Sequence, residues 1–224
     1  MGLPGVELFD DTDFRLVRPV SIGAEATIYE VTLRGTPLIA KVRVPKPYRN
    51  AVIDRDVRER RTLNEVRTMS KAHDIGIVVP HIVHVDLPNS IIFMEYVRGT
   101  ELREVLYKSP ETHLKFAGDL GRYLGEMHEH GLYHGDPTPA NLIVRDGELC
   151  IIDFGLSGYS DDVEEHAADV NLVERSVYSS YPVMARDFIE LFWRGYREVR
   201  GSFSEAEVKK RVAEIRRRAR YVMR

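Results

Sequence analysis

The feature that most constrains this chain is its stretch from residue 134 to residue 155. It places Asp136 five positions before Asn141, and it sets an Asp-Phe-Gly sequence at Asp153 directly behind a short apolar run. Phosphoryl transfer requires a carboxylate that orients the acceptor and oxygen ligands that hold Mg²⁺ beside the triphosphate. Asp136 suits the first task, and Asn141 and Asp153 suit the second. A plain turn also uses Gly, Asp, Pro and Asn, but it leaves the second acidic motif unexplained, so the stretch predicts the polar core of a phosphotransferase.

The length and composition are those of a globular protein. The chain has 224 residues, 43% of them hydrophobic and 30% charged, which is enough for one domain or for two small lobes. No apolar run is long enough to cross a bilayer, and the acidic first residues lack the layout of a signal peptide, so we expect a cytoplasmic protein with no membrane partner. Cys150 is the only cysteine, which excludes a disulfide within the chain and a cysteine zinc site.

Lys41 lies near the end of a predicted strand, where its ammonium group is a candidate functional cation. Residues 14–17, 27–33 and 38–44 are rich in β-branched side chains and are separated by turn signals, which predicts a β-meander. A lysine at the end of a strand is usually only solvated. It gains significance when a carboxylate on the following helix holds its ammonium group in place.

The following helix is expected over residues 52–73, and it offers Glu59 and Glu65. An apolar stripe at helical spacing that includes Val66 and Met69 adjoins Glu65, which predicts that this carboxylate faces inward. Glu59 is surrounded by arginines and is interpreted as a surface ion-pair residue. We therefore choose Glu65 as the partner of the strand lysine.

The loop between the first two strands carries small residues. Ser21, Gly23 and Ala26 are small, and Ile28 follows in the next strand. Small side chains allow backbone N–H groups to approach phosphate oxygens closely. Compared with the glycine-rich pattern of kinases, however, the loop keeps one glycine of three, so a plain hairpin turn remains the alternative.

The strand expected over residues 90–97 ends in a sequence that resembles a kinase hinge, in which backbone groups bind the edge of an adenine base. Strand-like sequence also covers residues 77–85, on the other side of a turn. At the hinge, the Glu95 carbonyl and the Val97 N–H would contact the edge of the base. An ordinary edge strand that leads into a turn differs little in sequence, and the position between the lysine and the catalytic stretch favours the hinge.

Helices are expected over the rest of the chain, at residues 112–130, 167–179, 183–199 and 204 to the end. Asp169, in the second of these, could reach back to the catalytic stretch. Four arginines near the end form a candidate contact for the phosphate backbone of a nucleic acid, which the family resemblance given below identifies as tRNA: Arg216, Arg217, Arg218 and Arg220. The ordinary alternative is a solvated helix face, but almost no carboxylates are close in sequence to pair with them.

The order of these features resembles the protein-kinase-like superfamily over essentially the whole chain. The catalytic stretch resembles the kinase catalytic loop and its Asp-Phe-Gly motif, with Gly135 where arginine is usual. The resemblance implies an α+β, minimal two-lobed protein-kinase-like fold. Residues 1–97 would form a β-rich N-lobe with a long helix, and residues 98–224 a truncated helical C-lobe.

Finer details resemble the small atypical kinase of the KEOPS (EKC) complex. They are Gly-Ala-Glu-Ala in the phosphate loop, Lys-x-Tyr-Arg after the strand lysine, Arg-Thr-x-x-Glu-x-Arg around Glu65, Gly-Asp-x-Thr in the catalytic loop and a late Ser-x-Tyr-Pro. Pro137 and Pro139 depart from the family pattern, and the basic tail of the family is present only as the arginine cluster near the end.

This resemblance implies an atypical serine/threonine kinase or ATPase that uses ATP and Mg²⁺. It would serve a complex that makes threonylcarbamoyladenosine in tRNA. The implied partners are the threonylcarbamoyl-transferring subunit, a small subunit that binds the N-lobe, and tRNA through the complex.

Two alternatives come from other classes. A small-molecule phosphotransferase of the aminoglycoside-kinase type also uses His-Gly-Asp with an asparagine five residues on, but Asp153-Phe154-Gly155 and the short C-terminal part argue against it. A pseudokinase-like tRNA-binding scaffold would keep a nucleotide site without turnover. Retention of Lys41, Glu65, Asp136 and both metal candidates argues against the loss of nucleotide binding.

Overall fold

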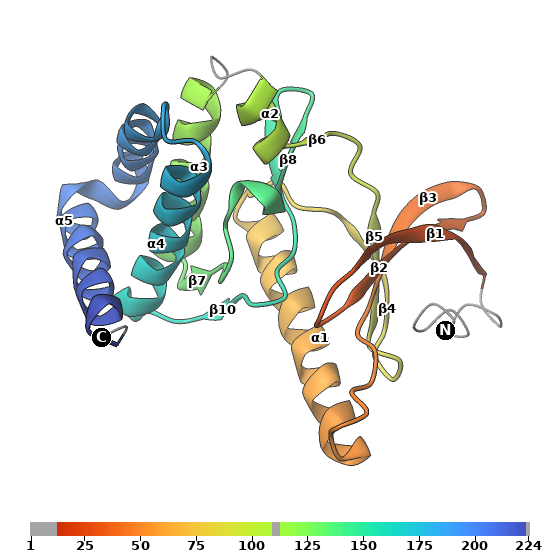
Figure 1. Ribbon diagram of the computed structural model, residues 1–224. Coiled ribbons are helices and arrows are strands. Elements are labelled where there is room, and N and C mark those ends of the chain that lie inside the picture. Colours follow the sequence, from red (N-terminus) through yellow and green to blue (C-terminus); the bar gives the residue numbers. More distant parts are fainter. Residues whose placement is uncertain (1–12, 109–112, 223–224) are drawn as a thin grey trace. The chain divides into compact units, whose positions relative to one another are not determined.

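The computed structural model describes residues 13–108 and 113–222, and the side chains of residues 113–114 and 220–222 are not described (Figure 1). The chain divides into two compact units. The first unit lies within residues 1–70 and 80–97, and the second lies within residues 71–79 and 98–224. Each unit is described by itself.

The first unit is built on a five-stranded antiparallel sheet in the order β1-β2-β3-β5-β4. The strands are β1 (Phe14–Ile22), β2 (Thr27–Leu33), β3 (Thr36–Val42), β4 (Ile82–Asp86) and β5 (Ile91–Glu95). The β-meander is therefore present. Strand β1 extends further than expected, up to the small-residue loop, and residues 77–81 lie outside the strand expected over 77–85.

Alternation along the strands separates two faces of this sheet. Tyr29 pairs with Ala40, and Ala40 pairs with Phe93, so these side chains share one face and belong to its buried apolar cluster. The ring of Phe14 stacks on that of Phe93, with centroids 3.7 Å apart. Because successive side chains of a strand point to opposite faces, Lys41 lies on the other face.

Helix α1 (Ala51–Asp74) begins in the first unit, and its last residues group with the second. Its first turn is capped by Asn50, whose side-chain oxygen accepts hydrogen bonds from the N–H groups of Val52 and Ile53, at 3.0 and 3.4 Å. It ends where Gly76 takes a φ of 88°, a left-handed conformation that suits glycine. The helix expected over residues 52–73 is thus present.

The second unit is mainly helical: α2 (Leu102–Lys108), α3 (His113–Glu129), α4 (Val163–Ser180) and α5 (Ala185–Val222). A small sheet of β6 (Thr100–Glu101), β8 (Leu142–Arg145) and β9 (Glu148–Ile151) and a pair formed by β7 (Leu132–Tyr133) and β10 (Gly158–Tyr159) complete it, with the 3₁₀ turn η3 (Pro139–Asn141). Helix α2 was not expected from the sequence.

Helices α3 and α5 approach closely because glycines face each other. A Cβ atom added at Gly195 would lie 2.1 Å from the Gly118 carbonyl oxygen, so no larger residue fits there without a shift. Helix α5 is not regular throughout: Gly201, with a φ of 74° and a ψ of 168°, separates two helical halves, in line with the two helices expected. Across this break, Arg197 donates to Glu205 at 2.9 Å. Among the described residues, no helix is long and apolar enough to cross a membrane.

Candidate active site

In the first unit, Lys41 and Glu65 form a buried ion pair. Lys41 Nζ lies 2.6 Å from Glu65 Oε1, and the two residues are 5% and 1% exposed. Strand β3 supplies the lysine and the inward face of α1 supplies the carboxylate. The structure therefore brings together the lysine and the glutamate chosen from the sequence, whereas Glu59 stays partly exposed.

The small-residue loop is the turn of the β1–β2 hairpin. Ile22 pairs with Thr27, and the Gly23 N–H donates to the Ala26 carbonyl at 3.0 Å. Lys46 contacts the Ala24 carbonyl, and Arg61 forms an ion pair with Glu25. Lys46, in the segment before α1, and Arg61, on α1, thus both contact the loop. Of the other predicted loop residues, Ser21 pairs with Ile28 across the hairpin.

The hinge candidates lie at the end of β5. Glu95 is the last residue of the strand, and its N–H donates to the His81 carbonyl at 2.8 Å. Its carboxylate accepts a hydrogen bond from the His81 N–H at 3.2 Å. Val97 follows the strand and is 8% exposed. The backbone leaves the sheet at this point, as a hinge segment requires.

In the second unit, Asp136 and Asn141 meet within the catalytic loop. Asn141 Nδ2 donates to the Asp136 carbonyl and to Asp136 Oδ2, both at 2.9 Å. Pro139 occupies the first position of η3, where a missing N–H costs nothing, and the Asn141 N–H closes the turn on the Thr138 carbonyl at 2.8 Å. The prolines that depart from the family pattern are thus compatible with a well-formed loop.

Asp153 lies directly after the β8–β9 hairpin. The Ile152 N–H donates to the Asn141 carbonyl at 2.9 Å. This hydrogen bond joins the loop at Asn141 to the residue immediately before Asp153. Asp153 has a φ of 63°, a conformation that is uncommon for residues other than glycine, and its Oδ1 accepts from the Gly155 N–H at 3.1 Å. Strained backbone of this kind is concentrated at functional sites.

Asp169 on α4 holds the catalytic loop. Its two oxygens accept hydrogen bonds from the N–H groups of His134 and Gly135, at 2.6 and 2.7 Å, and it is 1% exposed. The expectation that Asp169 reaches back to this loop is therefore confirmed.

Gly135 replaces the arginine of the usual kinase pattern for a steric reason. Its φ is 83°, and a Cβ atom added there would lie 2.4 Å from the Leu156 carbonyl oxygen. A side chain would thus meet both an unfavourable backbone conformation and another stretch of backbone.

His134 links the catalytic loop to the segment that contains Asp153. Its Nδ1 accepts from the Asp136 N–H and its Nε2 donates to the Ile152 carbonyl, both at 3.2 Å, which fits a neutral imidazole. Its ring packs on that of Phe154, with centroids 4.8 Å apart. Burial lowers the pKa of His134, in agreement with the neutral form.

Sequence reasoning missed a second layer of buried polar groups behind the loop. His128 Nε2 contacts Asp169 at 3.3 Å, and its Nδ1 contacts the hydroxyl of Tyr196 at 2.9 Å. The ring of His166 stacks on that of His128 with centroids 4.3 Å apart. No signal in the sequence connected these histidines with a tyrosine on the last helix.

The arginines near the end of α5 differ in their ion-pair partners. Arg216 binds Glu174, and its Nε donates to Asn171 at 2.9 Å. Arg218 binds Glu164. The expectation that almost no carboxylates were available to these arginines was therefore wrong, because α4, distant in sequence, supplies them. The side chain of Arg220 lies outside the described residues.

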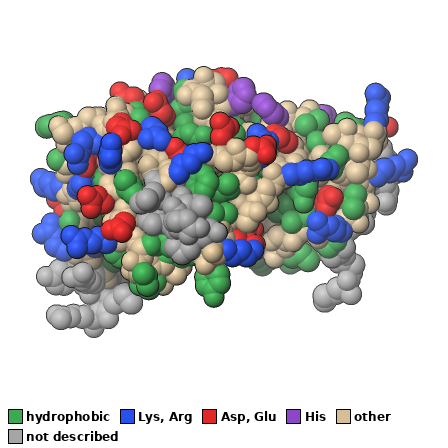
Figure 2. Space-filling model, turned by 90° about the horizontal axis from the view of Figure 1, so that it is seen from above, with side chains coloured by type: hydrophobic (Ala, Val, Ile, Leu, Met, Phe, Trp, Pro, Cys, Tyr) green, Lys and Arg blue, Asp and Glu red, His purple; other side chains and the backbone are tan. Residues whose placement is uncertain are grey.

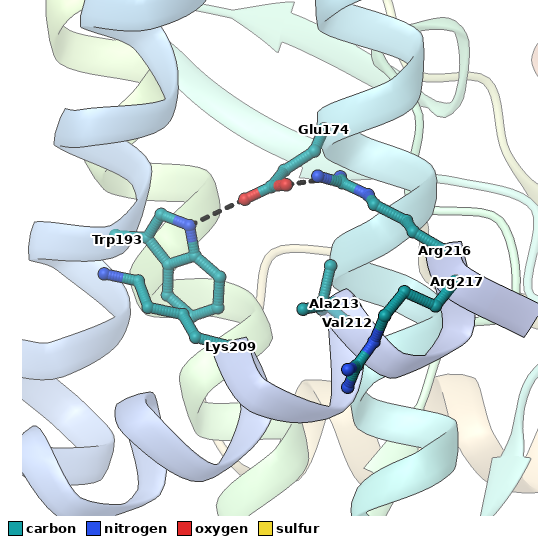
Figure 3. A pocket seen from close by; sticks show the side chains of 7 residues that line it. All are labelled: Glu174, Trp193, Lys209, Val212, Ala213, Arg216 and Arg217. Carbon is teal, nitrogen blue, oxygen red and sulfur yellow. Dashed lines mark hydrogen bonds and ion pairs between the residues drawn. The ribbon is translucent and has the colours of Figure 1, made fainter.

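Arg216 lines a hollow of about 600 Å³ between α4 and the two halves of α5 (Figure 3). Trp193 Nε1 donates to Glu174 at 2.7 Å, and Lys209 lies over the indole ring, 4.7 Å from its centroid. Arg216 points toward Glu174 in Figure 3, whereas Arg217 points away from it. On the face drawn in Figure 2, the basic side chains at the left end have acidic side chains among them.

The fold, the lysine–glutamate pair and the paired Asp136 and Asn141 are those of a protein-kinase-like protein. A family model described as the ABC1 atypical kinase-like domain matches residues 57–174, more than half of the chain. The fold is also that of the Rio2 kinase from Chaetomium thermophilum, solved as an ADP/Mg²⁺-phosphoaspartate complex: the TM-score is 0.65, with 92% of this chain and 72% of that chain covered at 18% identity.

Curated relatives are more similar in sequence. "KEOPS complex subunit Bud32" of Pyrococcus abyssi is 39% identical over 89% of this chain and 94% of its own length. "EKC/KEOPS complex subunit bud32" of Dictyostelium discoideum is 38% identical over 73% of this chain and 68% of its own length. A "probable bifunctional tRNA threonylcarbamoyladenosine biosynthesis protein" of Methanothermobacter thermautotrophicus is 34% identical over 89% of this chain, which spans 36% of that protein. The chain belongs to the Bud32 family of atypical kinase-like proteins.

Proposed function

We propose that this protein binds ATP with Mg²⁺ and transfers or hydrolyses the γ-phosphoryl group. We further propose that this turnover supports threonylcarbamoyladenosine formation in tRNA within a KEOPS complex. The observation that carries the proposal is the catalytic loop itself, in which Asn141 holds Asp136 while Asp169 fixes the backbone before it. A turn with no catalytic role would not require a buried carboxylate to accept two N–H groups of the loop.

The donor set of the loop fits a magnesium ion. Both N–H groups of the Asn141 amide are used on Asp136, so its oxygen is the atom that can coordinate a cation. Asp153 would supply the carboxylate, since Mg²⁺ prefers oxygen ligands. Bound Mg²⁺ would neutralise charge on the β- and γ-phosphates. Asp136 would orient the acceptor, which is a serine or threonine hydroxyl in a kinase reaction and water in an ATPase reaction.

In the first unit, Lys41 would contact the α- and β-phosphates while Glu65 holds its ammonium group. The hairpin turn that includes Ser21, Gly23 and Ala26 would present backbone N–H groups to phosphate oxygens, and Ile28 would pack against the base. Glu95 and Val97 would contact the adenine edge through backbone atoms.

The names of the relatives support the biological assignment over a small-molecule phosphotransferase. Two are named as KEOPS complex subunits, and one is named for threonylcarbamoyladenosine biosynthesis. In the bifunctional relative, a sequence similar to this chain is joined to a longer remainder. Such a fusion supports a physical association of this chain with another component of threonylcarbamoyladenosine biosynthesis, and we propose that this component is the threonylcarbamoyl-transferring subunit. A small subunit that binds the first unit would be a further partner.

We also propose that the basic end of α5 contacts tRNA in the assembled complex. Arg217 is exposed and, unlike Arg216 and Arg218, has no ion-pair partner in the part of the chain that the structure describes. Lys210 is also exposed and has no ion-pair partner among the described residues. It lies seven residues before Arg217, on the same side of the helix. These two cations are better placed for phosphates than the paired arginines.

Replacement of Asp153 by alanine tests the proposed function. It removes the carboxylate that would hold Mg²⁺, so ATP turnover by the full chain and threonylcarbamoyladenosine formation by the reconstituted complex should both be lost. Asp161→Ala, in the acidic run after the loop, is the matched control and should leave ATP turnover unchanged. Wild-type turnover by Asp153→Ala would refute the metal assignment. Lost turnover with normal tRNA modification would identify a scaffold.

A further inference from the structure

Arg43 is a buried cation that shares a carboxylate with Lys41. It follows β3 directly, two residues after Lys41, so both side chains lie on the same face of the sheet. Arg43 Nη2 donates to Glu65 Oε2 at 2.5 Å, while Lys41 Nζ binds Glu65 Oε1 at 2.6 Å. One carboxylate therefore bridges two cations, with one oxygen for each.

The two cations and the shared carboxylate are shielded from solvent. Lys41, Arg43 and Glu65 are 5%, 3% and 1% exposed, so two positive groups and one negative group are buried together. A lysine–glutamate pair alone would be formally neutral. Burying a further cation costs free energy, and ion pairs of this kind are seldom retained for stability.

The hydrogen bonds of the guanidinium group are also incomplete. Arg43 Nε and Nη1 are buried and have no hydrogen-bond partner among the described residues. The nearby Asp54 already binds Arg58, whose Nε donates to it at 2.8 Å. Buried donors without partners are rare in native proteins, so each one requires an explanation.

We propose that Arg43 is a positioning residue of the nucleotide site, an inference that rests on the proposed function. An ammonium group has three N–H donors, and Lys41 directs one of its donors to Glu65 Oε1. When other N–H groups of Lys41 donate to phosphate oxygens, the attraction between Lys41 and Glu65 weakens. Arg43 keeps its hydrogen bond to Glu65 Oε2 during this change. The Glu65 carboxylate therefore stays in position and continues to orient the Lys41 ammonium group.

The experiment measures ATP affinity of the full chain with a fluorescent ATP analogue, together with thermal unfolding. Arg43→Met keeps the length of the side chain and removes the charge. Its Kd for the analogue should rise about tenfold, as expected for one missing charge-assisted hydrogen bond, while the thermal unfolding curve shows that the variant is folded at the temperature of the assay. Arg43→Lys restores the charge and should recover part of the affinity. Arg60→Met, an exposed arginine on α1, is the matched control and should bind normally.

A double variant separates positioning from direct contact with phosphate. If Arg43 acts through Glu65 on Lys41, then Lys41→Met with Arg43→Met should bind no more weakly than Lys41→Met alone. A further loss in the double variant would make Arg43 a direct phosphate ligand and overturn the positioning role. A lower unfolding midpoint with normal affinity in Arg43→Met, or in Arg43→Lys if the methionine variant does not fold, would leave only a structural ion pair and also overturn it. Unchanged affinity in Lys41→Met would instead refute the proposed nucleotide site.

Discussion

At Asp136, the Asn141 amide donates to one carboxylate oxygen, and in the proposed reaction the other oxygen would orient an acceptor hydroxyl or water. Asp136→Asn keeps the size of the side chain but removes its basicity. We expect ATP binding to be retained while turnover falls by about a hundredfold or more, since groups of this kind typically contribute 10²–10⁴. Binding assays and single-turnover kinetics would measure the two effects separately. An equal loss of binding and turnover would point to misfolding and leave the catalytic role unsupported.

Three buried histidines predict how stability depends on pH. Burial lowers the pKa of His166 to about 4, and burial also lowers the pKa of His128 and of His134. Unfolded histidines titrate near 6.5, so the unfolded chain binds more protons below that pH. The free energy of unfolding should therefore fall as the pH drops from about 6.5 toward 4, by up to about 1.4 kcal/mol per pH unit for each proton.

Urea unfolding at several pH values measures this slope. His166→Gln should reduce the slope by up to one proton, whereas Ser179→Ala, at an exposed serine of the same helix, removes no titratable group and should leave the slope unchanged. A slope in His166→Gln equal to that of the wild type would contradict the assignment.

Residues of the candidate site differed in how far the sequence could indicate them. Asp136 and Asn141 stand five apart in one loop, so their spacing alone predicts that they meet. Glu65 was found because an apolar stripe adjoins it. Arg43 and Tyr196 were missed, since their partners lie 22 and 68 residues away and no local pattern records such pairings.

Among the elements, Gly201 sets the geometry of α5. Its φ and ψ of 74° and 168° are accessible almost only to glycine, and no atom would obstruct a Cβ there. Gly201→Ala should therefore destabilise the protein by about 1–3 kcal/mol through backbone strain alone. Denaturant unfolding measures the change, with exposed Ser202→Ala as the control. An unchanged unfolding midpoint would mean that the two halves of α5 tolerate a continuous helix.

The long helices were predictable because their apolar periodicity is local. Helix α3 was expected over residues 112–130 and spans His113–Glu129. Short elements were not predictable in this way. Helix α2 has seven residues, and β6 has two; such elements depend on neighbours such as β8, which are distant in sequence.

For the whole molecule, some basic residues of α5 have ion-pair partners and others have none among the described residues, and this division predicts which of them would contact tRNA in the proposed complex. Replacing Lys210 and Arg217 by glutamine should weaken tRNA binding by the assembled complex and flatten its salt dependence. The log–log slope should change by about 0.7–0.9 for each phosphate that is no longer neutralised. Truncation from Arg216 is less informative, because it also removes the partner of buried Glu174.

The matched variants are Arg216→Gln and Arg218→Gln. They should lower stability more than they alter the salt slope, since both arginines are held by carboxylates of α4. Filter-binding titrations would compare the two sets of variants. They would cover roughly 50 to 200 mM salt, the range over which the affinity of phosphate contacts changes strongly. If replacing Lys210 and Arg217 leaves the slope as it was, these cations belong to a solvated face or to a protein interface.

The glycine at position 135 also bears on regulation. Protein kinases are commonly switched on when a phosphate added to the activation loop is captured by arginines, which orders the loop. At position 135 this chain has no side chain to capture such a phosphate, and the Leu156 carbonyl fills the space that one would need. The catalytic loop is instead secured by Asp169, a group that no signalling enzyme adds or removes. Any control of this protein through covalent modification would have to act elsewhere, and association with partners offers another means by which a cell could set its activity.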